Sequence, residues 1–282
     1  MPGLLQTLRW SAITSLTLIF AGAAYAGDLR MATTTSTENS GLLKVLLPKF
    51  EAATGIHVQV IAVGTGKAVK LGESGDVDVV LVHARQLEDA FIVSGGGIDR
   101  RDVMYNDFIL VGPTADPAGI RGQRNVIQSM ETIASAGEKA GAKFISRGDN
   151  SGTDVMEKAY WKTANIEPKG KPWYVSAGLG MGEVLNMAAQ MNAYTLSDRA
   201  TYGAYRAKTG LDIVLAGDPR MFNPYGIIAV NPKKYPGINY TDATKLIEWI
   251  TSPAGQQAIA DFKVNGEQVF FPNYGKALAS GK

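Results

Sequence analysis

The stretch DLRMATTTSTENSGLLKVLLPKFEAATGIHVQVIAV, residues 28–63, contains a strand, a helix and a second strand in chain order. DLRMAT is strand-like, and apolar residues then recur at helical spacing from Leu42 to Phe50. IHVQVIAV, residues 56–63, is predicted to be the second strand. Five consecutive hydroxyl side chains, Thr33 to Thr37, lie between the first strand and the helix. One hydroxyl is enough to cap a helix, so this row indicates a further role.

The strand and helix alternation continues along the chain, which predicts an α/β fold with a parallel sheet and ligands at the carboxyl ends of its strands. Further strands are predicted at 77–83, 102–112, 142–146, 193–197, 211–217 and 227–232. Further helices are predicted at 84–96, 124–136, 152–164, 181–192, 199–208, 241–252 and 253–264, and GTGKAVKLGE, residues 64–73, is predicted to be a Gly-led turn into a short helix.

Two stretches rich in Pro and Gly interrupt this rhythm, PTADPAGIRG at 113–122 and DPRMFNPYG at 218–226. They divide the chain after a predicted signal peptide into two α/β lobes. Residues 27–110 and 225–282 form the first lobe, and residues 111–224 form the second. Because the chain crosses between the lobes twice, we expect a hinged clamshell that closes on a ligand in the cleft.

Residues 1–26 have the features of a cleavable signal peptide. Arg9 provides the positive charge, SAITSLTLIFAGAA the apolar core, and AYA a small-residue cleavage site before Gly27. The apolar core is shorter than the roughly 20 residues of a membrane-spanning helix. Since the chain has no cysteine to carry a lipid at this junction, we expect a free protein in the periplasm.

Composition excludes several function classes. The net charge of +2 gives no field that favours nucleic acid or an anionic membrane. Two histidines and no cysteine make a transition-metal centre improbable, and no H-E-x-x-H spacing is present. GTGKA, residues 64–68, lacks the first Gly and the Ser or Thr of a phosphate-binding P-loop. We therefore expect no bound metal and no cofactor, and we expect Lys67 to be solvated.

Small polar residues follow four predicted strands, each at the start of a helix. A helix N-terminus offers unpaired N–H groups and partial positive charge, so several converging ends would form a cage for an oxyanion. The candidate ligand-binding residues are Thr34, Thr35, Ser36, Thr65, Gly66, His83, Ala84, Arg147, Ser151, Gly152 and Thr153. The alternative is helix capping alone, and Thr35 with Glu38 fits a capping box.

The segment SRGDNSGTD, residues 146–154, is the most specific of these junctions. It places the Arg147 guanidinium beside a helix N-terminus, an arrangement that suits a tetrahedral dianion. The alternative is an exposed Arg147 paired with Asp149 or Asp154.

An exported serine hydrolase or phosphatase is the competing hypothesis from another class. Ser36 or Ser151 would be the nucleophile and His83 the base. No G-x-S-x-G motif is present, which counts against an enzyme. The other histidine, His57, lies within a predicted strand and is interpreted as structural.

Seven segments together resemble the periplasmic tungstate-binding proteins of ABC uptake systems. They are ATTTSTENSGLL, VGTGKA, DVDVVLVHA, YNDFILVGP, SRGDNSGTD, NPYGIIAVNP and SPAGQQAIADF. The resemblance implies a type II periplasmic binding protein, related to molybdate and sulfate binders, that grips an oxyanion and delivers it to a permease in the inner membrane. The arginine of the family's second lobe is matched by Arg147, and its Thr and Ser ligands by Thr35, Ser36 and Thr153. We expect a monomer.

The residues alone identify the bound anion less specifically than the family resemblance does. Tungstate, molybdate and sulfate carry no proton at neutral pH and suit a cage of donors, whereas hydrogen phosphate favours a carboxylate acceptor. Glu38, Asp149 and Asp154 lie near the predicted site, so a phosphate receptor remains an alternative, as do molybdate and sulfate receptors. Tungstate rather than molybdate rests on the resemblance alone.

Overall fold

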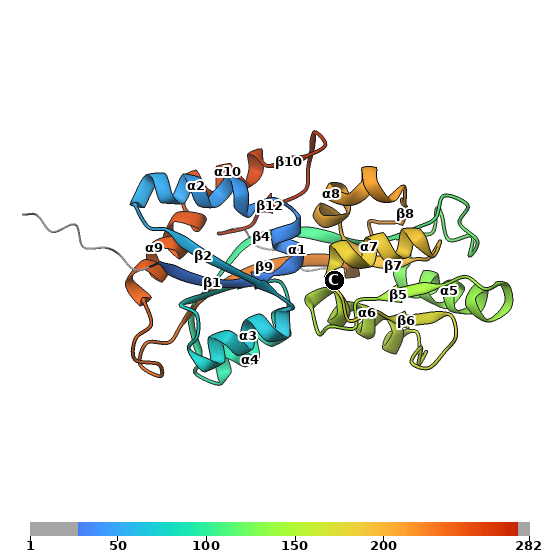
Figure 1. The fold of residues 1–282 in the computed structure, drawn as a ribbon, viewed down its shortest axis with the longest axis horizontal. Helices are drawn as coiled ribbons and strands as arrows, with labels where there is room; N and C mark the ends of the chain where they lie inside the picture. The colour runs from blue at the N-terminus through green and yellow to red at the C-terminus, as the bar shows by residue number, and fades with distance from the viewer. Residues whose placement is uncertain (1–27, 276–282) are drawn as a thin grey trace, which may run out of the picture.

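A computed structural model describes residues 28–275. The predicted signal peptide at 1–26 lies outside the described residues. Two α/β lobes lie side by side, and the long strands β4 and β9 run from one into the other (Figure 1). The described residues contain no helix long and apolar enough to span a membrane.

The chain runs first through the blue and cyan lobe of Figure 1. Its elements are β1 (Leu29–Thr34), α1 (Thr35–Asn39), α2 (Leu43–Thr54), β2 (Val58–Val63), α3 (Thr65–Ser74), β3 (Val79–Val82), α4 (Arg85–Val93) and β4 (Gly97–Gly112). The second lobe follows with α5 (Val126–Ala140), β5 (Phe144–Ser146), α6 (Gly152–Thr163), β6 (Tyr174–Ser176), α7 (Met181–Gln190), β7 (Thr195–Asp198), α8 (Arg199–Thr209), β8 (Asp212–Leu215) and the 3₁₀ turn η1 (Pro219–Met221). The chain then returns with β9 (Phe222–Val230), α9 (Tyr240–Thr251), α10 (Pro253–Asp261), β10 (Lys263–Val264), β11 (Glu267–Gln268) and β12 (Phe271–Pro272).

The sheet is mixed, so the predicted parallel sheet is only partly right. Strand β1 pairs in parallel with β2 and β3, and β5 pairs in parallel with β6. Strand β9 is antiparallel to β3 and to β4, and β4 is antiparallel to β7 and β8. The error arises because β4 and β9 carry the chain out of the first lobe and back, which forces them to run in opposite directions.

Each lobe has its own hydrophobic core. In the first lobe, Met31, Phe50 and Ile247 belong to one cluster, and a second cluster lies on the other face of the sheet. The core changes from the first lobe to the second between Met104 and Phe108 on β4. It changes back between Met221 in η1 and Tyr225 on β9. The two strands are therefore the only covalent links between the cores among the described residues.

The prediction for His57 is wrong. Strand β2 begins at Val58, one residue later, and the His57 side chain is 62% exposed. Its Nδ1 lies 3.0 Å from Asp28 Oδ1 at the surface.

Candidate functional site

The hydroxyl row begins on the last strand residues of β1 and continues into α1. Thr33 Oγ1 donates to the carbonyl of Leu81 at 2.8 Å, which holds β1 against β3. Thr34 is the N-cap of α1, and its Oγ1 accepts from the Thr37 N–H at 3.2 Å. The predicted capping box is therefore wrong by one residue, because Thr34 and not Thr35 is the cap. Thr35 and Ser36 in the first turn remain for another use.

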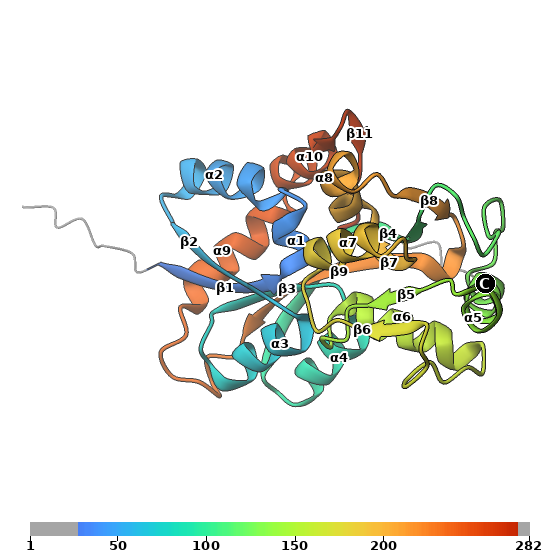
Figure 2. The same ribbon diagram turned by 45° about the vertical axis from the view of Figure 1, so that its right-hand side comes forward.

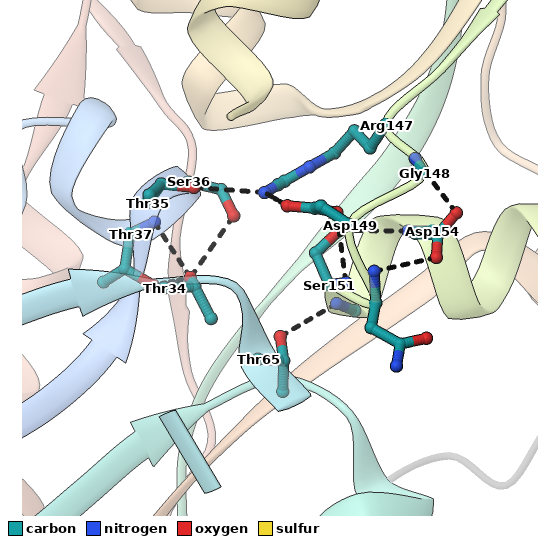
Figure 3. Close-up of polar contacts among 12 residues, drawn as sticks. Thr34, Thr35, Ser36, Thr37, Thr65, Arg147, Gly148, Asp149, Ser151 and Asp154 are labelled. Carbon is teal, nitrogen blue, oxygen red and sulfur yellow. Dashed lines mark hydrogen bonds and ion pairs between the residues drawn. The ribbon is translucent and has the colours of Figure 1, made fainter. Parts of the chain in front are cut away.

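The second half of the site is the loop between β5 and α6. The buried Asp154 carboxylate accepts from the Gly148 N–H at 3.2 Å and from the Asn150 N–H at 3.0 Å. Ser151 caps α6 by accepting from the Asp154 N–H at 3.2 Å. These bonds fix the loop that presents Arg147 and the N-terminus of α6 (Figure 3).

Arg147 is buried, with 1% of its surface exposed, so the predicted alternative is right in its pairing with Asp149 and wrong in placing Arg147 at the surface. Its Nη2 donates to Asp149 Oδ2 at 2.6 Å and, across the cleft, to Thr35 Oγ1 at 3.1 Å. Its Nε and Nη1 are buried without a hydrogen-bond partner among residues 28–275, as is Thr153 Oγ1. Unpaired donors on a buried cation are costly, and an anion between them would satisfy both.

Direct hydrogen bonds hold the two lobes together beside this arginine. The Gly152 N–H donates to Thr65 Oγ1 at 2.8 Å, and the Gly66 N–H donates to the carbonyl of Asn150 at 3.2 Å. Figure 3 shows Thr65 facing the loop of the other lobe. These groups of Thr65, Gly66 and Gly152, predicted as ligand donors, therefore join the lobes in this arrangement.

His83 lies at the end of β3, behind the hydroxyl row. Its Nε2 is 3.1 Å from Thr34 Oγ1 and 3.3 Å from Ser36 Oγ, and its Nδ1 is 3.0 Å from Asn223 Oδ1. Burial and, to a smaller extent, the positive charge of Arg147 lower the pKa of His83 against the opposing hydrogen bond of Asn223, and together they bring it to about 4. The imidazole is therefore neutral at neutral pH.

The structure brings the predicted nucleophile Ser36 near the predicted base. However, a histidine with a pKa of about 4 is a weak base at neutral pH. The alternative nucleophile, Ser151, is a helix cap.

One predicted ligand residue is used otherwise. The backbone N–H of Ala84 donates to Glu88 Oε1 at 3.1 Å, so it is engaged within the first lobe. Lys67 is exposed, as predicted. No group of three or more His, Cys, Asp or Glu residues that could hold a metal ion occurs within residues 28–275.

The sequence analysis missed the contribution of α7 and α8, which lie beside α1 in both views (Figures 1 and 2). Thr201 Oγ1 on α8 donates to the carbonyl of Ser36 at 3.0 Å. Asp198 caps α8 by accepting from the Thr201 N–H at 2.9 Å. The signal was present, because Asp198 lies at another strand-to-helix junction of the same kind as the four singled out.

The fold and this donor-rich junction between two lobes define a class of protein. A family model described as "PBP superfamily domain" matches residues 21–254, and the chain therefore belongs to the PBP superfamily.

Its relatives within the superfamily are closely similar. The tungstate-binding protein TupA of Peptoclostridium acidaminophilum is 46% identical over 254 residues, which cover 89% of this chain and 87% of that protein. The crystal structure of the tungstate ABC transporter from Geobacter sulfurreducens has 55% identity and a TM-score of 0.76, covering 84% of this chain and 99% of that chain. The tungstate-binding protein TupA from Desulfovibrio alaskensis G20 has 47% identity and a TM-score of 0.73, covering 87% and 98% of the two chains.

Proposed function

We propose that this protein binds tungstate in the cleft between its lobes and delivers it to the permease of an ABC transporter. The similarity to tungstate-binding proteins supports this assignment. The observation that carries it is Arg147, a buried cation with two unpartnered nitrogen atoms between the hydroxyl row and the N-terminus of α6. A dianion at this place offsets the buried charge and accepts from the free donors.

The nearby carboxylates favour an anion without a proton. Asp149 accepts from Arg147 through Oδ2 and from the Ser151 N–H through Oδ1 at 3.1 Å. Both oxygens of Asp154 accept from the backbone of its own loop. These acceptors are engaged, so hydrogen phosphate would find its proton poorly matched there. Tungstate and molybdate, which only accept, fit the remaining donors.

Not all candidate residues have the same role in this proposal. Thr35, Ser36, Arg147 and Thr153 contact the oxyanion, and the N-terminus of α6 at Ser151 and Gly152 adds its partial positive charge. Thr65 and Gly66 close the lobes, and His83 and Thr34 support the donors from behind.

The proposal also covers the lobe boundaries, the location and the oligomeric state of the protein. The lobe boundaries predicted at 110/111 and 224/225 become, within residues 28–275, a first passage between Met104 and Phe108 and a second between Met221 and Tyr225, where the core changes. The protein is an exported periplasmic monomer that performs no catalysis, because binding and release require none.

Calorimetric titration of the purified protein with tungstate, molybdate, sulfate and phosphate tests the proposal. We expect tight binding of tungstate, with molybdate as the nearest competitor and phosphate much weaker. Heat with none of the four anions would refute it. Tighter binding of phosphate than of tungstate would favour the phosphate receptor instead.

A hydrolase would give a different result. A panel of carboxylic and phosphate esters should show no turnover that depends on Ser36 or His83. Turnover by the wild-type protein that is lost in Ser36→Ala would establish the enzyme hypothesis.

A further inference from the structure

Four buried side chains form a hydrogen-bonded series that crosses the hinge behind the site. Asn106 on β4 and Asn223 on β9 are paired in the strand register, and Asn223 Nδ2 donates to Asn106 Oδ1 at 2.7 Å. Asn106 Nδ2 lies 3.4 Å from Asp198 Oδ1 at one end, and Asn223 Oδ1 lies 3.0 Å from His83 Nδ1 at the other. All four residues are at most 3% exposed. The series therefore links a helix cap in the second lobe to the imidazole in the first.

The helix cap Asp198 determines which group donates and which accepts in each hydrogen bond of the series. Asp198 Oδ1 accepts from the backbone N–H of Thr201, so it is an acceptor toward Asn106 as well. Burial raises the pKa of Asp198, which the charge of Arg147 and the Thr201 hydrogen bonds oppose. A proton on this carboxyl would occupy Oδ2, which has no partner among the described residues. Oδ1 thus accepts in either protonation state.

Each following group has only one orientation that matches. Asn106 must turn its NH₂ toward Asp198, so its carbonyl oxygen faces the NH₂ of Asn223. The carbonyl oxygen of Asn223 then faces His83, whose Nδ1 must carry the imidazole proton to donate. Because the ring is neutral, Nε2 is left as an acceptor.

The acceptor at Nε2 determines how the hydroxyl protons are distributed. Thr34 Oγ1 lies 3.1 Å from Nε2 and also contacts three other groups, the Thr37 N–H at 3.2 Å, Thr37 Oγ1 at 2.7 Å and Ser36 Oγ at 3.2 Å. When Thr34 donates to Nε2, its lone pairs accept both groups of Thr37. Ser36 Oγ is farther from Nε2, at 3.3 Å, and the Thr34 oxygen 3.2 Å away has no lone pair left to accept from it, so the Ser36 proton is not used within this cluster.

We propose that Asp198, Asn106 and Asn223 are positioning residues that hold His83 in the Nδ1–H tautomer, so that Thr34 donates to His83 and Ser36 is free to donate to the anion. This inference rests on the proposed function for the identity of the anion, but the tautomer itself does not depend on it. Neither asparagine contacts the oxyanion; they act through His83.

The chain offers a simple spectroscopic test, because it has two histidines. Replacing the exposed residue by His57→Gln leaves His83 as the sole imidazole, and labelling with ¹⁵N-histidine then reports its tautomer. In the anion-free protein at pH 7, Nδ1 should show the shift of a protonated ring nitrogen and Nε2 that of an unprotonated one.

Two variants in this background break the series and one preserves it. Asn106→Leu and Asp198→Ala remove the hydrogen bonds that orient the Asn223 amide toward His83. The Nε2–H form of His83 should therefore become populated, and tungstate affinity should fall at least fivefold. Asp198→Asn retains an oxygen that accepts from Thr201, so it should keep the Nδ1–H tautomer and affinity within twofold. Thermal unfolding and circular dichroism identify any variant that fails to fold, in which case the other breaking variant provides the comparison.

An Nε2–H tautomer of His83 in the His57→Gln protein, where Asp198, Asn106 and Asn223 are unchanged, overturns the inference. Loss of the Nδ1–H form in Asn106→Leu without any change in tungstate affinity overturns it as well. The spectra are recorded without anion, so failure of the wild-type protein to bind tungstate would refute the proposed function and leave the assignment of the tautomer to be judged by the spectra.

Discussion

Gly152→Ala should weaken anion binding by preventing full closure of the lobes. A Cβ at this position would lie 2.8 Å from the carbonyl oxygen of His83 and 2.9 Å from its Nδ1. These contacts are too short to form, and both atoms belong to a buried, hydrogen-bonded residue that has little room to move. The second lobe would therefore stop about half an ångström or more short of its present position, since ordinary contacts of this kind are longer.

The cost can be worked out from the hydrogen bonds between the lobes. Moving the second lobe away from the first would lengthen the 2.8 Å hydrogen bond from the Gly152 N–H to Thr65. It would also strain the two neighbouring hydrogen bonds, Gly66 to Asn150 and Arg147 to Thr35. At about 1 kcal/mol for each bond weakened, the loss is about 1–3 kcal/mol, or about 5- to 150-fold in affinity. The open protein should be slightly more stable, by about 0.4–1 kcal/mol, because alanine restricts the unfolded chain more than glycine.

Calorimetry with tungstate and thermal unfolding without it measure the two opposite effects. Ala159→Ser on the exposed side of the same helix adds an atom without meeting the other lobe, and it should leave tungstate affinity unchanged. If Gly152→Ala binds tungstate within twofold of the wild-type protein, the close approach of His83 does not limit closure and the reasoning fails.

Two further predictions concern single side chains. Arg147→Ala should lower tungstate affinity at least about 100-fold, because two charge-assisted hydrogen bonds of about 1.5–3 kcal/mol each are lost; the matched removal of an exposed charge, Lys67→Ala, should change it less than twofold in the same titration. Burial raises the pKa of Glu157 from 4.5 to about 7. Between these pH values the unfolded chain has released the proton that the folded protein retains, so this group makes stability fall as pH rises, by about 3 kcal/mol in total. In Glu157→Gln, Oε1 can still accept from Trp161 and Tyr174, so denaturant unfolding should show a smaller loss of stability from pH 4.5 to 7; an unchanged loss would place the titration elsewhere.

Local patterns were sufficient to predict most of the fold. Helical spacing and glycine stops located the helices, whereas the first Pro- and Gly-rich break, at 113–122, comes after the passage between the lobes, which lies between Met104 and Phe108 on β4. Strand direction was not predictable in this way, because periodicity in β4 and β9 reports which faces are buried and carries no information on which neighbour each strand pairs with. Pairing of Gly97 with Val230 joins residues far apart in sequence, and only the packed lobes determine it.

The sequence predicted those parts of the candidate site that depend on a single strand-to-helix junction. The hydroxyl row and Arg147 each follow a strand, so the rule for strand ends places them in the cleft. The rule does not say what each group does once two junctions face each other. Thr65 and Gly152 both satisfy it, yet they bond to one another. The series through Asn106 and Asn223 was missed because both residues lie inside strands, where a polar side chain gives no local signal.

The return of β9 to the first sheet also affects the order in which the protein can fold. The second-lobe core is drawn from one continuous segment, from Phe108 to Met221. The first-lobe core needs both Leu29 and Phe270, from opposite ends of the described chain. A chain synthesised from its N-terminus therefore has its second lobe ready to fold while the first still waits for the segment from β9 onward. During that interval the inner faces of β1 and β3 need protection from aggregation, which makes this stage the vulnerable step of biogenesis.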